Sequence, residues 1–69
     1  MDDRETLRER LRAMLKRPPL HSKLEGVMAV REFKKRHAEA RKLVDKPSAT
    51  AQQLVSATET IRYYVEATA

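Results

Sequence analysis

Five cations that recur on one side of a predicted helix carry the clearest chemical signal in this sequence. They are Arg31, Lys34, Lys35, Arg41 and Lys42. Clustered cations bind nucleic acid because they release the counterions that condense on its phosphates. They can equally form a solvated face that keeps a small helical protein soluble, and Glu32 with Arg36, four residues apart, is an ordinary intrahelical pair beside them. Both interpretations stay open, and a nucleic-acid contact here would involve phosphates more than bases.

Catalytic residues are harder to assemble from this chain. Its 69 residues include no cysteine, one glycine and two histidines, which excludes thiol catalysis, cysteine-ligated zinc and glycine-rich phosphate loops. Ser22 and Ser48 stand at expected helix starts, where a serine is explained by capping. We find no serine in the sequence that pairs with a base and an orienting group, as a catalytic nucleophile requires. A thin bundle also has no room for the roughly 300 Å³ cavity that a small-molecule site needs. We therefore expect no enzymatic activity, no cofactor, no metal and no small-molecule substrate.

The charge is positive and unevenly spread. The net charge is +5 with an isoelectric point near 10.0, and residues 1–44 hold 13 Lys/Arg against 7 Asp/Glu. The longest apolar run, Val27 to Val30, is far shorter than the ~20 residues of a membrane span, and the charged N-terminus is unlike a secretory signal. We expect a cytoplasmic protein. A membrane-surface role for a helix at 2–17 ranks below nucleic-acid binding, because that helix has no Trp or Phe.

Prolines divide the chain into the elements that must position these side chains. Pro18-Pro19 and Pro47 cannot lie inside a helix, because proline has no amide donor and its ring clashes with the preceding turn. The segments about 2–17, 22–45 and 48–68 have helical apolar spacing and no period-two alternation. Capping pairs mark the starts of these segments: Asp2 with Glu5, Ser22 with Glu25, and Ser48 or Thr50 with Gln53. The sequence predicts an all-α protein with a single small helical domain over residues 1–69.

The second and third predicted helices carry matching heptad seams. The first seam is Gly26, Val30, Phe33, His37, Ala40 and Val44, and the second is Ala51, Leu54, Thr58, Ile61, Val65 and Thr68. If the chain reverses at 46–48, each residue of one seam falls opposite a residue of the other, in six layers. This predicts an antiparallel helical hairpin. Its polar layer, His37 with Thr58, would fix the register or act as a pH-sensitive latch.

The short helix at 2–17 has one apolar stripe that must dock against something. The stripe consists of Leu7, Leu11, Met14 and Leu15. Because a chain below about 70–80 residues rarely stabilises itself without staples or partners, we expect a protein partner or self-association into a larger helical bundle. Tyr63 and Tyr64 are adjacent in the third helix, and exposed tyrosines often anchor interfaces.

The apolar stripe and the two tyrosines together favour a small non-enzymatic interaction module, such as an adaptor, chaperone or regulator of a larger assembly. The alternative is a basic nucleic-acid-binding protein that uses the five cations of the second helix, with help from the basic first helix. A reader of the standard helix-turn-helix type is disfavoured, because the third helix is slightly acidic and offers few side chains that reach base edges.

One segment of the third predicted helix resembles a known family. The pattern Leu54-x-Ser56-Ala57-x-x-x-Ile61-x-Tyr63 resembles the second helix of the small YscE-type co-chaperones of type III secretion. The resemblance covers about ten residues and implies a helical hairpin that holds a needle subunit together with a second chaperone. The basic first helix departs from that pattern, since such a hairpin does not require one. A secretion co-chaperone is therefore a lesser alternative.

Overall fold

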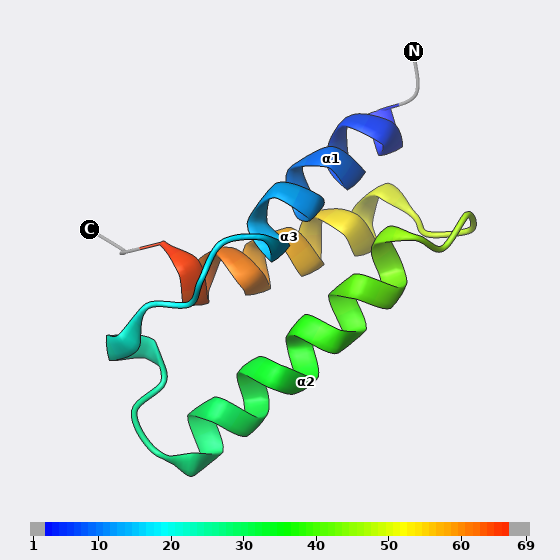
Figure 1. Ribbon diagram of the computed structural model, residues 1–69. Coiled ribbons are helices and arrows are strands. Elements are labelled where there is room, and N and C mark those ends of the chain that lie inside the picture. Colours follow the sequence, from blue (N-terminus) through cyan, green and yellow to red (C-terminus); the bar gives the residue numbers. More distant parts are fainter. Residues whose placement is uncertain (1–2, 67–69) are drawn as a thin grey trace.

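Three α-helices joined by two loops make up the fold of residues 3–66 (Figure 1). The computed structural model describes residues 3–66, with α1 at Asp3–Leu15, α2 at Val27–Val44 and α3 at Ala51–Val65. A short 3₁₀ turn, η1 (His21–Lys23), lies in the long loop between α1 and α2. All three helices pack against one another. The predicted all-α fold, a helical hairpin with a short N-terminal helix, is confirmed.

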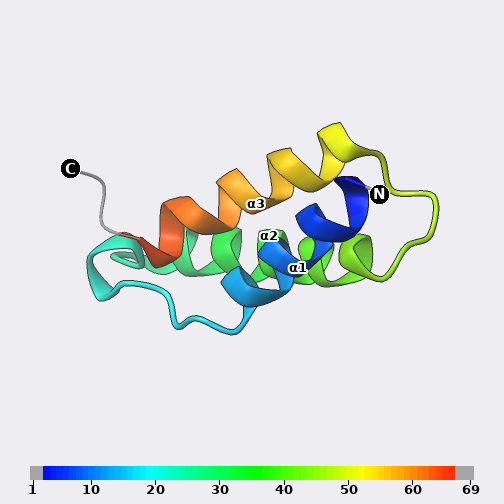
Figure 2. The ribbon, with the colours of Figure 1, turned by 90° about the horizontal axis from the view of Figure 1, so that it is seen from above.

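The two loops close opposite ends of the molecule, which measures 41 × 24 × 18 Å. A tight turn at 45–50 joins α2 to α3, and the loop that follows α1 passes the C-terminal end of α3 (Figure 2). In that loop the Leu20 amide donates to the Tyr64 carbonyl at 2.7 Å. The last four carbonyls of a helix have no partner within it, so this bond satisfies one of them and fastens the loop to α3.

The second helix begins later than predicted. Ser22, expected as its N-cap, lies in η1, and α2 begins after Gly26 without a side-chain cap. Gly26 has φ 90° and ψ 154°, a conformation essentially restricted to glycine. Because a helix cannot continue through such a residue, the segment before it forms a separate turn.

The other two helices agree more closely with the sequence. The predicted cap of α3 is confirmed: the Thr50 hydroxyl accepts a bond from the Gln53 amide, and the Gln53 side chain accepts one from the Thr50 amide. The α1 helix ends at Leu15, just before the proline pair, and α3 ends at Val65. The predicted cap at Asp2 lies outside the described residues.

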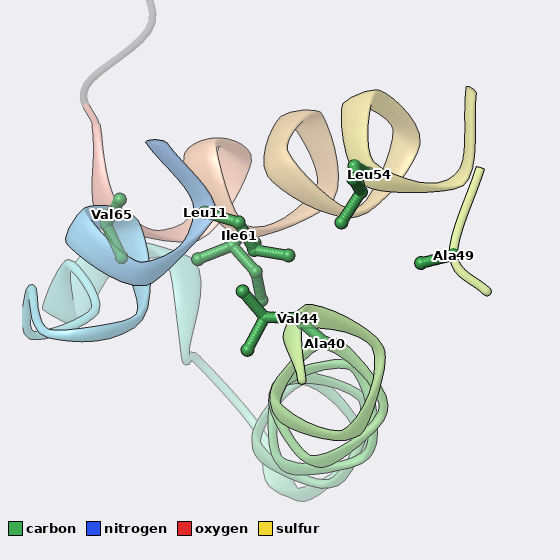
Figure 3. Close-up of a cluster of buried hydrophobic side chains, with 7 residues drawn as sticks. All are labelled: Leu11, Ala40, Val44, Ala49, Leu54, Ile61 and Val65. Atoms are coloured by element: carbon green, nitrogen blue, oxygen red, sulfur yellow. The ribbon is translucent and has the colours of Figure 1, made fainter. Parts of the chain in front are cut away.

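The hydrophobic core lies where α1 meets the hairpin (Figure 3). Leu11 of α1 and two residues of α3, Leu54 and Ile61, are fully buried. Leu11 lies beside Ile61, with Val44 of α2 just below them (Figure 3). The rest of the buried cluster is Ala40, Ala49 and Val65. The α1 helix therefore supplies a central core residue and is an integral part of the fold.

The predicted six-layer pairing of α2 with α3 holds only in part. In the layer nearest the turn Val44 is buried but its expected partner Ala51 is exposed, whereas Ala40 and Leu54 of the next layer lie in the same buried cluster.

Farther from the turn the two helices diverge (Figure 1). The contact between them there is an edge-to-face packing of the Phe33 and Tyr64 rings, whose centroids are 5.1 Å apart. At the open end of the hairpin, Gly26 is not packed against α3: a Cβ placed on it would meet no atom within 4 Å. The α1 helix, which the two-helix pairing did not include, packs against both α2 and α3.

The predicted layer of His37 with Thr58 is replaced by other contacts. His37 Nε2 lies 3.2 Å from the carbonyl oxygen of Leu15, at the C-terminus of α1. The Thr58 hydroxyl donates to the Leu54 carbonyl of its own helix at 2.7 Å. His37 therefore links α2 to a carbonyl that has no partner within α1, rather than setting the register of the hairpin. Thr68, in the last predicted layer, lies outside the described residues.

Candidate nucleic-acid interface

The apolar stripe of α1, predicted as a surface for a partner, is used inside the chain. Leu11 is fully buried, and Leu7, Met14 and Leu15 are half-buried against the same core. This corrects the expectation that the stripe is free. A short helix is marginal by itself in water, and here the hairpin provides the surface on which it docks.

The two tyrosines, predicted as a second interaction surface, have different environments. Tyr64 is 8% exposed and packs against Phe33, and burial, with a smaller effect of the nearby Glu32 carboxylate, raises its pKa. Tyr63 is half exposed, with the Lys23 Nζ 4.1 Å from the centre of its ring. Only Tyr63 is therefore available to a partner in this fold.

The five predicted cations lie together on the outer face of α2. Their side chains, Arg31, Lys34, Lys35, Arg41 and Lys42, are all exposed, and we call them the basic face. Since a helix turns about 100° per residue, they gather on the side opposite Ala40 and Val44, which are buried in the core (Figure 3). From its first to its last cation the basic face extends about 16 Å along the helix.

The charge of the basic face is not neutralised within residues 3–66, where none of its five side chains has an ion-pair partner. The neighbouring carboxylates are held by other arginines. Arg36 contacts Glu32 at 2.8 Å and Glu39 at 3.6 Å on the flank of α2. Arg12 of α1 contacts Asp45 at 3.7 Å. The positive charge of the basic face is therefore not neutralised by ion pairs among the described residues.

Two arginines of α1 and one of the loop that follows it contact the hairpin, which the sequence did not indicate. Arg8 Nη2 donates to the carbonyls of Lys46 and Pro47 at 3.0 and 3.2 Å. Arg17 Nη1 donates to Glu66 Oε1 at 2.9 Å. These contacts join residues that are 38 to 49 positions apart in the sequence. No pattern of neighbouring residues predicts contacts of this kind. They reduce the contribution to nucleic-acid binding that we expected from the first helix.

The surface also has open hollows, of which two bear on function. A groove of about 450 Å³ between α2 and α3 is lined by apolar side chains such as Ala40 and Leu43, by several polar ones, and by the charged residues Arg36 and Glu39. The expectation that the bundle has no room for such a volume was wrong. A second hollow, of about 540 Å³, lies at the start of α2 beside Val27 and Arg31. Val27 and Met28 there are 69% and 75% exposed, and we call them the apolar tip.

Metal-ligating side chains do not gather in groups of three or more anywhere in residues 3–66. The helices of that part of the chain are too short or too polar for any of them to cross a bilayer.

Comparison with protein-family models, curated proteins and solved structures finds no match to this chain. The segment that resembles a secretion co-chaperone has a direct structural explanation. Its Leu54 and Ile61 are fully buried, and its Ala57 packs against them. The apolar part of the pattern that carries the resemblance is therefore the spacing that α3 needs for packing in its own core, whereas Ser56 and Tyr63 are exposed.

Proposed function

We propose that this chain is a small, non-enzymatic nucleic-acid-binding protein that contacts the phosphate backbone through the basic face of α2. The supporting observation is a set of five exposed cations on one helix face, without an ion-pair partner among the described residues. A polyanion relieves the mutual repulsion of such cations and loses its own condensed counterions on binding. We rank this function above the interaction module, because the α1 stripe is occupied inside the chain.

The proposal makes a quantitative statement about salt. Each phosphate that is neutralised on B-form DNA contributes about −0.9 to the slope of log affinity against log salt concentration. Four or five such contacts therefore give a slope of about −3.6 to −4.5. The arginines of α1 that are engaged in intramolecular contacts add little to this value.

The test is a charge reversal on the basic face, read by fluorescence anisotropy with a labelled duplex at several salt concentrations. We expect Lys34→Glu with Lys35→Glu to weaken binding at least tenfold at low salt and to reduce the salt slope by about 2. The matched control is Arg10→Glu with Lys16→Glu, which makes the same charge change at exposed positions on and just after α1 and should cause a much smaller loss. Unchanged affinity in the first variant, with normal helicity by circular dichroism, would refute the proposal.

Protein contact is a second candidate function, favoured by the exposure of the apolar tip. An adaptor, chaperone or regulator of an assembly, or a self-associating protein, would use this surface instead of the α1 stripe. Sedimentation velocity at two protein concentrations, with Met28→Glu as the comparison, tests the self-associating form. We expect the wild type to form a larger species that Met28→Glu loses; a single monomeric species at both concentrations would remove self-association.

A further inference from the structure

The cations at the edges of the basic face form two parallel rows. Because each residue turns the helix by about 100°, Lys34 and Arg41, seven residues apart, lie in one row. Lys35 and Lys42 lie in a second row, roughly 100° around the helix from the first. Within each row the two residues are about 10 Å apart along the axis. The positive charge thus follows both edges of the outer face of α2.

A strip of different composition runs between the two rows. It contains Val27, Arg31 and Ala38, all of them exposed. It ends at Asp45, which forms an ion pair with Arg12. Val27 and Ala38 are small or apolar, so neither obstructs the approach of a surface between the rows. Arg31 is the long side chain in the middle of the strip, and it has no ion-pair partner among residues 3–66.

This arrangement fits the major groove of B-form DNA. That groove is about 12 Å wide and admits an α-helix, with phosphates along both of its edges. A helix that lies in it brings the two edges of its outer face towards the two strands and its middle towards the bases. Arginine there bonds the O6 and N7 acceptors of guanine, and small apolar side chains contact the thymine methyl group.

The tertiary structure leaves the outer face of α2 free to enter such a groove. Both α1 and α3 lie on the other side of α2 (Figure 1), and α2 is the longest helix of the described chain, with 18 residues. Its N-terminal part extends past the region where the helices meet (Figure 1). A duplex could therefore approach both rows from outside, and at Arg41, which lines a hollow with Arg12 and Leu15 of α1, it would also lie near α1.

The geometry points to α2 as a helix that reads the major groove of double-stranded B-form DNA. Lys34 and Arg41 contact phosphates of one strand, and Lys35 and Lys42 contact phosphates of the other. Arg31 is the residue that determines sequence preference, through a guanine. This inference rests on the proposed function and goes beyond it, since it names the form of nucleic acid, the groove and the base-reading residue.

The first experiment compares one sequence as duplex DNA, duplex RNA and single-stranded DNA in anisotropy titrations with the full chain. The major groove of A-form RNA is too deep and narrow for side chains to read, so we expect duplex DNA to bind at least tenfold more tightly than duplex RNA. Equal affinity for the two duplexes would overturn the groove assignment, and the phosphate contacts of the proposed function would stand.

The second experiment selects binding sequences from a random duplex library with the wild type, Arg31→Ala and Arg31→Lys. We expect the wild type to enrich a guanine at one position, with roughly 10- to 100-fold discrimination against other bases there. Arg31→Ala should lose that preference and keep most of its affinity for random duplex. Lys42→Ala is the matched control, which should reduce the salt slope by about 1 without changing the selected base.

The outcomes separate the two proposals. Duplex binding with no selected base, or with a base that Arg31→Ala still selects, would overturn the role of Arg31 and leave the proposed function intact. Absence of binding to every nucleic acid at low salt would overturn both. Binding to anionic phospholipid vesicles in place of DNA would do the same, and would identify the basic face and the apolar tip as a membrane-surface contact.

Discussion

Arg8 is a single side chain that ties α1 to the turn of the hairpin. Its side chain is only 14% exposed, and it donates to two carbonyls of the turn, those of Lys46 and Pro47. These carbonyls follow the end of α2, where backbone acceptors lack helical partners and a cation is favoured.

We predict that Arg8→Ala lowers the free energy of unfolding by about 1 kcal/mol, since two bonds from a charged donor are lost at a partly solvated site. Urea denaturation followed by circular dichroism measures the change. Arg10→Ala, at an exposed position of the same helix, is the control and should leave the midpoint where it is. An equal effect of the two substitutions would mean that helix propensity, and not the turn contact, is what Arg8 contributes.

Gly26 is a residue whose type is required by the backbone conformation. Its φ of 90° lies in a region that other residues enter only with strain. The space around it is open, so the strain of a substitution there comes from the backbone and not from a clash.

Gly26→Ala should destabilise the protein by about 1–3 kcal/mol, and Gly26→Asn by a similar amount. Thermal melts of these variants beside Glu25→Ala, an exposed neighbour, check the prediction. A melting temperature for Gly26→Ala equal to that of the wild type would show that the start of α2 does not depend on this conformation.

At the scale of elements, the position of α1 decides which surfaces are free. A helix of 13 residues does not persist in isolation, and its stripe has the same composition whether it faces its own hairpin or another protein. In the structure it faces the hairpin, with Leu11 at the centre of the core.

Leu11→Ala tests this docking. Removal of a fully buried leucine costs about 2–5 kcal/mol, a large share of the stability of a small domain. We expect a sharp fall in the denaturation midpoint and loss of helical signal from more than α1, because α2 and α3 pack against the same side chain. If α1 instead stood free for a partner, the substitution would leave the isolated chain as stable as before.

At the scale of the whole molecule, Glu66 connects two distant parts of the chain. Its carboxylate accepts from Arg62 of α3 at 2.8 Å and from Arg17 of the loop after α1 at 2.9 Å. These bonds, the one from Arg62 first, lower the pKa of Glu66 below its ordinary value. The carboxylate is thus favoured in the folded chain, so the pairing stabilises the fold above the pKa of the unfolded chain and is lost as pH falls through the lowered folded value.

We therefore predict that the fold loses stability as the pH drops below the ordinary range of a glutamate carboxyl group. In Glu66→Gln, which cannot ionise, this part of the acid dependence should vanish, and stability at neutral pH should be lower than that of the wild type. Urea midpoints measured from neutral to acid pH test this, with Glu59→Gln, an exposed residue of α3, as control. Parallel curves for wild type and Glu66→Gln would contradict the assignment.

The candidate site was largely predictable from the sequence, because the placement of side chains around a helix is a local property. Once Pro18-Pro19 and Pro47 bound the second helix, a turn of about 100° per residue places the five cations on one face and the apolar seam on another. The buried stripe of α3 and the Thr50 cap follow from equally local rules.

Tertiary structure alone decided which of several similar apolar surfaces meet. The α1 stripe can cover a partner, a second copy or its own hairpin at comparable gain in buried area, and heptad spacing does not say how far two helices run together before a third intervenes. In the structure, Leu11 lies beside Ile61, so the α1 stripe is buried against its own hairpin, and the basic face of α2 is exposed. Local sequence therefore determines where the helices lie along the chain. Which surface stays exposed depends on a competition for burial among apolar surfaces that are far apart in the sequence.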